Sequence, residues 1–317
     1  MDVGQLTQRL PVRVFMLCQA LALVFGLAIS NAHALDLAPR TGVPPPPGVS
    51  AASISVAHRS FEGTVAIGDL GSASGRVDRQ NVSLRYGRSG ELSNRPVYTY
   101  INLPLVDFDV GGSVARNEAL ALAPDQGVGD IAVAAAIWPY TNREAGRFLG
   151  VAGYLVLPTG EYDSKRTVGL NLNPGNNRFA AIIQTGWHQE LSDRWAWSIA
   201  ADVMFFEDND EYIGDDVITK VPSRFEVKPY ASYQSALSYQ ANSALTLAMS
   251  YYVDRGAESR NVGSEWGSAI NRERYGLWAL MTLSARTQLN LSYKSTIDDA
   301  SGLELKENVQ LRLIRFF

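Results

Sequence analysis

Histidine and cysteine, which carry much of enzyme chemistry, are scarce in this chain. It contains three histidines, His33, His58 and His188, and a single cysteine, Cys18. A nucleophilic triad needs a histidine beside a serine or cysteine, and no Gly-x-Ser-x-Gly motif occurs that would set a serine on a sharp turn. His188 has the polar parity of an amphipathic segment, so we interpret it as a polar wall residue. The sequence therefore predicts no catalytic residue, and we expect that the protein is not an enzyme.

An acidic segment at 206–216 contains residue types that bind metal ions. Asp208 and Asp210 have the spacing of the first two ligands of a calcium loop. However, Gly214 comes one position late, and Thr219 stands where the loop needs a bidentate acid. We interpret the segment as a solvated loop. No specific metal site and no cofactor are predicted.

Polar residues also recur on one face of several alternating segments. Successive side chains of a strand point to opposite faces, so residues of one parity share a surface. If these segments form a barrel, the polar parity lines its interior, and both charge signs are present. Such groups tune selectivity in a water-filled channel, or pair across a narrow bore and close it, and the sequence leaves both possibilities open. The candidate lumen-lining residues are Gln184, His188, Asp202, Lys228, Gln234, Asn290, Lys294 and Arg312.

The polar residues lie in segments that alternate with turn signals, which predicts β-strands. In 194–206, for example, Trp195, Trp197 and Ile199 share a face opposite Asp202. No run of about 18 apolar residues follows the N-terminal region, so no membrane-spanning helix is expected. The predicted strands lie near 60–68, 77–88, 96–110, 129–140, 147–157, 178–190, 194–206, 225–239, 243–254, 272–283, 286–296 and 304–317.

The connections between these segments alternate strictly between short and long. Short turns at 191–193, 240–242 and 284–285 alternate with long connections such as 158–177 and 207–224. An up-and-down barrel with short periplasmic turns and long external loops has this pattern, whereas Greek-key crossings would disrupt it. The sequence therefore predicts an all-β fold, a transmembrane antiparallel up-and-down β-barrel of about 12 strands closed by its C-terminal strand.

The final segment, from Leu303 to Phe317, has one apolar and one polar parity and stops on an aromatic residue. It resembles the closing strand of bacterial outer-membrane barrels, whose terminal aromatic is read by the barrel-assembly machinery. Glu307 interrupts the apolar parity and is tolerable only at an interfacial depth. We expect Trp195, Trp197 and Phe317 to lie at the membrane interface, where aromatic side chains are enriched.

The N-terminal region reads as a secretory signal. Arg9 and Arg13 precede an apolar run, and Ala32-His33-Ala34 is a cleavage signature. We expect a signal peptide at 1–34, a Pro-rich periplasmic leader at 35–58 and a barrel at 59–317. The only cysteine lies in the signal, so the mature chain needs no disulfide. The net charge of −4 provides no electrostatic footprint for nucleic acid.

Three segments together resemble one protein family. They are Gly127-Val-Gly-Asp130, Leu157-Pro-Thr-Gly-Glu-Tyr-Asp163 and Leu170-Asn-Leu-Asn-Pro-Gly-Asn-Asn177. In this order they are similar to segments of the outer-membrane barrels grouped as the putative MetA-pathway of phenol degradation family. The resemblance covers about residues 95–317 and implies a transport-type barrel that passes hydrophobic or aromatic compounds. It assigns no binding residue, and we expect the glycines to serve turn geometry.

Two functions from different classes fit these observations. The first is a channel in the outer membrane of a Gram-negative bacterium for passive uptake of small compounds, hydrophobic or aromatic ones among them. The second is a structural or adhesive barrel whose long external loops bind partners. The expected partners are outer-membrane lipid, lipopolysaccharide, the barrel-assembly machinery and a small-molecule solute. A secreted soluble β protein would need another element to cover the apolar faces.

Overall fold

The computed structural model describes residues 36–66, 72–113, 115–116, 124–164, 172–213, 221–263, 265–299 and 303–317. The expected signal peptide lies outside these ranges. No helix in these ranges is long and apolar enough to cross a membrane.

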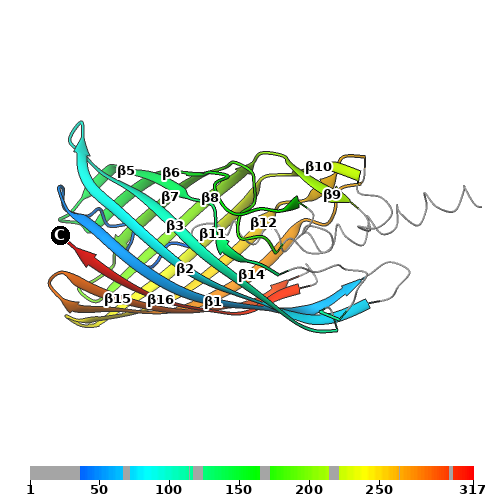
Figure 1. The fold of residues 1–317 in the computed structure, drawn as a ribbon. Helices are drawn as coiled ribbons and strands as arrows, with labels where there is room; N and C mark the ends of the chain where they lie inside the picture. Colours follow the sequence, from blue (N-terminus) through cyan, green and yellow to red (C-terminus); the bar gives the residue numbers. More distant parts are fainter. Residues whose placement is uncertain are drawn as a thin grey trace, which may run out of the picture.

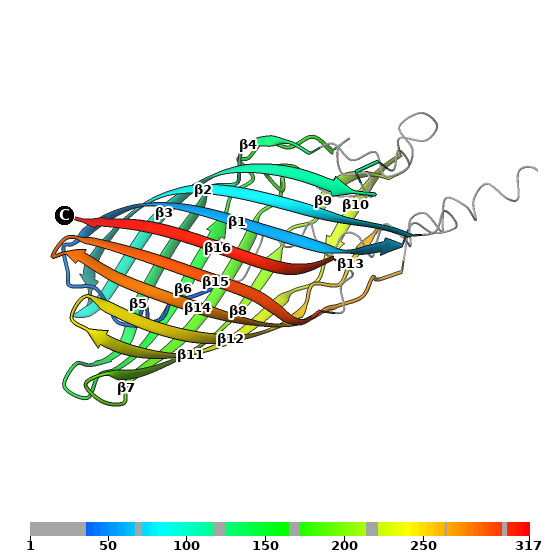
Figure 2. The ribbon, with the colours of Figure 1, turned by 90° about the horizontal axis from the view of Figure 1, so that it is seen from below.

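A closed barrel of twelve antiparallel strands dominates the fold (Figures 1 and 2). β1 pairs with β2 on one side and with β16 on the other, which closes the sheet and leaves no free edge. The fold prediction is thus confirmed. The barrel strands are β1 (Ser50–Ala66), β2 (Ser72–Leu92), β3 (Arg95–Gly112), β5 (Ala132–Asn142), β6 (Arg147–Val156), β7 (Ala180–Glu190), β8 (Trp195–Phe206), β11 (Tyr230–Asn242), β12 (Leu245–Gly256), β14 (Ile270–Ser284), β15 (Thr287–Asp299) and β16 (Leu303–Phe316).

Four short strands lie outside this closed ring. β4 (Gln126–Val128) adds to β3, while β9 (Asn209–Ile213), β10 (Val221–Val227) and β13 (Ser259–Asn261) form a separate small sheet. The short turns gather at the end of the barrel that holds Phe317, which we call the turn end (Figure 1). The longer connections and the small sheet lie at the opposite end, the loop end. The structure therefore has the predicted alternation, with the short connections at one end of the barrel and the long ones at the other.

Two strand boundaries differ from the sequence prediction. The predicted strand 225–239 is divided into β10 and β11, because Pro229 has no backbone N–H to donate to a ladder. β1 begins at Ser50, well before the expected start of the barrel at residue 59. Its first residues have small side chains, which weakened the apolar alternation there.

The closing strand contains a bulge that the simple alternation did not predict. Ser60 pairs with Glu307, but the next residue, Phe61, pairs with Leu305, so Lys306 is an extra residue. A bulge shifts the parity of everything beyond it. Leu305 therefore points inward and is fully buried, whereas Leu311 and Leu313 face outward.

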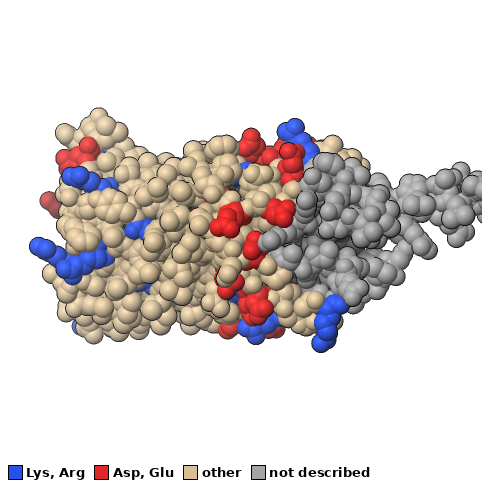
Figure 3. All heavy atoms as spheres, viewed as in Figure 1, with Lys and Arg blue, Asp and Glu red and all other residues tan. Residues whose placement is uncertain are grey.

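The apolar parity of the strands faces outward around the barrel. Ile183, Met249 and Leu277 on three different strands are each about half exposed. Figure 3 shows a broad band largely without charged side chains between charged groups at the turn end and an acidic zone nearer the loop end. A continuous exposed apolar belt is what a lipid environment accepts and what water would penalise.

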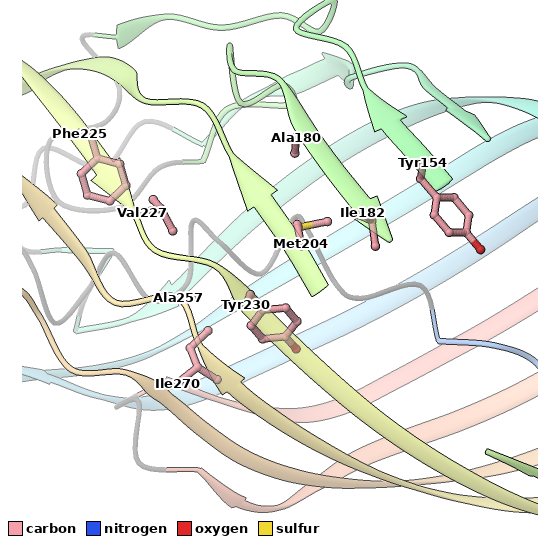
Figure 4. Packing of buried hydrophobic residues seen from close by; sticks show 9 residues of the cluster. All are labelled: Tyr154, Ala180, Ile182, Met204, Phe225, Val227, Tyr230, Ala257 and Ile270. Carbon is pink, nitrogen blue, oxygen red and sulfur yellow. The ribbon is translucent and has the colours of Figure 1, made fainter. Parts of the chain in front are cut away.

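Inside the barrel, a buried apolar cluster lies toward the loop end. Tyr154, Ile182, Met204 and Tyr230 come from four neighbouring strands, β6, β7, β8 and β11. Phe225 of β10 packs with them and is completely buried (Figure 4). The small sheet is thus held to the barrel by apolar contact as well as by hydrogen bonds.

Candidate functional site in the barrel lumen

The N-terminal leader, residues 36–49, enters the lumen. Figures 1 and 2 show it as a dark blue trace inside the turn end of the barrel. Gly48 N–H donates to Ser89 O at 3.1 Å, and Val49 N–H donates to Ser89 Oγ at 2.9 Å, which fixes the leader next to β2. The sequence prediction of an extended leader did not include a position within the bore.

Asp36 anchors the leader to the barrel wall through two cations. Arg274 of β14 donates to both Asp36 oxygens at 3.1 and 3.0 Å, and Lys294 Nζ lies 2.7 Å from Oδ2. Bidentate arginine–carboxylate pairs are among the strongest hydrogen-bonded contacts in proteins. Arg274 is completely buried, so the contact is shielded from water.

The same arginine also binds a second carboxylate, on the wall itself. Arg274 Nε lies 2.7 Å from Asp254 Oδ2, and Arg272 Nε lies 3.0 Å from that oxygen. Ser232 Oγ donates to Asp254 Oδ1 at 2.8 Å. The cations on this wall are therefore arranged to receive one carboxylate from the wall and one from the leader.

Three further contacts hold the leader along its length. Leu37 N–H donates to Gln234 Oε1 at 3.0 Å, and Trp138 Nε1 donates to the Gly42 carbonyl at 2.7 Å. Arg40 Nη1 donates to Gln240 Oε1 at 2.9 Å. These partners lie on β5 and β11, so the leader spans the bore rather than following a single strand.

A cavity of about 610 Å³ remains between the leader and the wall. This volume is within the range of about 300–1,000 Å³ typical of small-molecule sites. Its wall carries Tyr98, Tyr100, Trp138 and Tyr154, along with Gln184, Asn290, Arg85 and Arg312. The lining thus combines aromatic surface with a few polar groups, which suits a small organic molecule.

Most of the lumen candidates named from the sequence do lie on the inner face. Gln184 accepts from Tyr154 Oη at 2.7 Å and donates to Asp202 Oδ2 at 3.3 Å, and both Gln184 and Asp202 are buried. As described above, Gln234 and Lys294 hold the leader. Asn290 and Arg312 line the cavity.

Lys228 is the exception, and its prediction is corrected. It follows β10 and precedes Pro229, outside the barrel strand β11. Its Nζ lies 3.7 Å from Glu258 and 4.6 Å above the centre of the Trp266 ring, and the side chain is exposed. Because the strand breaks at the proline, the polar parity of β11 does not extend back to this residue.

His188 lies inside the barrel, completely buried. Its Nδ1 is 2.8 Å from Ser198 Oγ, and its ring packs against Phe148. A Cβ at Gly42 of the leader would stand only 2.7 Å from His188 Cβ, so the leader covers the pair closely. The described contacts of this histidine–serine pair include no carboxylate to orient the imidazole.

Sequence reasoning missed several inner residues. Asp254, Arg272 and Arg274 have the polar parity of their strands, and that signal could have found them. Asp36 carries no such signal, since its role depends on where the leader folds. In the acidic segment, Asp208 accepts from Arg224 Nε at 2.7 Å, and the described residues include no acidic or histidine cluster that could hold a metal ion.

The three family motifs come together at the loop end in one hydrogen-bonded cluster, which we call the motif cluster. The Asp130 carboxylate accepts from Gly160 N–H at 2.9 Å and from Asn176 N–H at 2.7 Å. Glu161 Oε1 accepts from Val128 N–H at 3.0 Å. A Cβ on Gly160 would lie 2.7 Å from Gly175 Cα, so the glycines allow close backbone approach rather than serving turn geometry alone.

Comparisons with known proteins support this picture. The family model for the putative MetA-pathway of phenol degradation matches residues 62–308. The chain belongs to this family. A search of the curated proteins finds no match.

Solved structures share the fold. The COG4313 outer membrane channel from Pseudomonas putida F1 matches with a TM-score of 0.77 at 22% identity, over 89% of this chain and all of that one. The beta domain of the Bordetella autotransporter BrkA matches with a TM-score of 0.54 at 10% identity, over 85% of this chain and all of that one. These matches show that the chain has the closed β-barrel fold of outer-membrane proteins.

Trp195 and Trp197 lie on the outer face near the turn end, as an interfacial girdle requires. The Trp195 ring packs against the Tyr239 ring in a tilted arrangement with centroids 4.8 Å apart, and Trp197 Nε1 donates to Ser235 Oγ at 2.9 Å. Phe317 is also exposed.

We expect lipids brominated close to the headgroup to quench a fluorescence component contributed by Trp195 and Trp197. Replacing both by phenylalanine should reduce that component, and replacing Trp187 as well should remove it, because Trp187 also lies on the outer face near the turn end, with its ring stacked on the exposed Tyr140. Trp138→Phe, which changes an inner residue, should leave the component in place. Unchanged headgroup quenching in the double variant would show that the girdle is at another depth.

Proposed function

We propose that this protein is an outer-membrane channel for passive uptake of small hydrophobic compounds, including aromatic ones. The observation that carries the proposal is the inner cavity, which is closed on one side by the leader and lined by five aromatic residues, Phe316 and the four named above. Family membership agrees with it, and the similar P. putida protein is described as an outer membrane channel. In this proposal the turn end faces the periplasm and the loop end faces outward.

A passive channel has two measurable properties, substrate flux and independence from energy. Intact Gram-negative cells are the right setting, since lipopolysaccharide slows the entry of hydrophobic molecules that cross phospholipid bilayers freely. We expect cells that express the protein to take up labelled toluene several-fold faster than cells without it. A protonophore should not change that initial rate. Equal rates in both cell types, or a rate abolished by the protonophore, would refute passive transport.

A further inference from the structure

One wall of the lumen carries four arginines that have no carboxylate partner among the described residues. They are Arg59 on β1, Arg79 and Arg85 on β2, and Arg312 on β16, three strands that lie side by side. Arg59 and Arg79 face each other directly in the ladder, and each has a buried Nε with no hydrogen-bond partner. By contrast, Arg272 and Arg274 have carboxylate partners. Arg272 binds Asp254, and Arg274 binds both Asp254 and Asp36.

Two of these arginines reach the cavity. Arg85 pairs in register with Ser53, and Arg312 pairs with Ser55, so both sit beside β1 two residues apart along it. With a strand spacing of about 4.8 Å and a rise of about 3.3 Å per residue, their Cα atoms are about 12 Å apart. Arginine side chains are long enough to bring two guanidinium groups from that separation to a single anion.

The charge balance of the cavity favours an anion. Its charged lining consists of Arg40, Arg85, Arg312 and Asp36. Asp36 is already held by Arg274 and Lys294, and Arg40 binds Gln240. The remaining excess of positive charge lies in a recess with low-dielectric walls, where the field of fixed cations is strengthened.

Aromatic surface adjoins these cations. The Arg85 guanidinium carbon lies 4.1 Å from the centre of the Tyr100 ring, which fixes the side chain by a cation–π contact. Tyr98 and Tyr100 lie with ring centroids 6.0 Å apart, and Tyr154 lies 6.2 Å from Tyr100. The cavity therefore offers an anion site and a flat apolar site within one volume.

We propose that this cavity binds aryl carboxylates, with Arg85 and Arg312 holding the carboxylate and the tyrosines and Trp138 packing against the ring. The inference rests on the proposed channel function and names a substrate class for it. Arg59 and Arg79 extend the cationic wall from the cavity toward the loop end, so an entering anion meets positive charge along its path. Carboxylate–guanidinium pairing supplies orientation as well as affinity.

Isothermal titration of the purified, folded barrel in detergent tests the proposal. Benzoate should bind, while benzyl alcohol, which has the ring without the charge, and acetate, which has the charge without the ring, should each bind at least tenfold more weakly. Arg85→Gln and Arg312→Gln should each weaken benzoate binding by about tenfold or more, because a charged hydrogen-bond partner is lost. Neither should change the binding of benzyl alcohol.

Arg88→Gln is the matched control, since Arg88 lies on the same strand as Arg85 with an exposed side chain. Benzoate binding should be unchanged in that variant. If a glutamine variant does not fold, as judged by heat-modifiable gel mobility, Arg→Lys at the same position keeps the charge and should still weaken binding by loss of the fork geometry.

Three results would overturn the inference: benzoate binding unaffected by both arginine variants, equal binding of benzoate and benzyl alcohol, or equal binding of benzoate and acetate. Each can occur while toluene uptake by cells remains intact, so the channel proposal would survive. Conversely, arginine-dependent benzoate binding without any solute uptake would support the site and refute the channel. The two proposals are therefore separable.

Discussion

Asp36→Asn should raise the single-channel conductance of the barrel several-fold in planar bilayers. The variant is nearly isosteric but removes the charge that pairs with Arg274 and Lys294. Removing one partner of a buried ion pair costs roughly 3–5 kcal/mol, because the remaining charge is left buried without compensation. Here that cost is borne mainly by the docked leader, so the population of undocked leader should increase by about 100-fold or more.

The barrel itself should stay folded in this variant, because Arg274 keeps its contact with Asp254 and the twelve-strand ladder is untouched. Glu304→Gln is the control, since Glu304 lies on the same barrel and pairs with Lys306 on the surface. It should leave the conductance unchanged. Wild-type conductance in Asp36→Asn would mean that the ion pair does not hold the leader in the bore.

Gly160→Ala should destabilise the barrel markedly. A Cβ there would lie 2.7 Å from both Gly129 C and Gly175 Cα, and 2.9 Å from Asp130 N. All three are backbone atoms of the motif cluster, so they cannot rotate away from the added Cβ. Overpacking costs typically 1–3 kcal/mol, and backbone clashes on three sides put this site at the upper end. The temperature at which gel mobility shifts should therefore fall by several degrees.

Gly153→Ala is the matched control for this effect. Gly153 lies in β6, and no atom lies within 4 Å of the position that its Cβ would take. We expect the gel mobility of Gly153→Ala to shift at the same temperature as that of the wild type. If the gel mobility of the two alanine variants shifts at the same temperature, close packing of the glycines does not stabilise the motif cluster.

Patterns within single segments of the sequence were sufficient to predict the barrel. Period-two alternation located twelve strands, and the alternation of short and long connections predicted an up-and-down topology. Both signals are local because a strand between lipid and lumen must alternate along its own length. The same parity placed Gln184, Asp202, Lys294 and Arg312 on the inner face. It failed at Lys228 and Leu305, where a proline and a bulge reset the register.

The sequence by itself thus determined the fold class, the membrane face and most of the inner polar residues, since each follows from a repeat within one segment. Only the tertiary structure decided that Asp36 meets Arg274 across more than two hundred residues of chain. It also decided that the leader lies across the bore, that three distant motifs form one cluster, and that Arg85 and Arg312 share a cavity. These contacts depend on barrel closure and on the stagger between strands, and neither can be predicted from the residue pattern of a single strand.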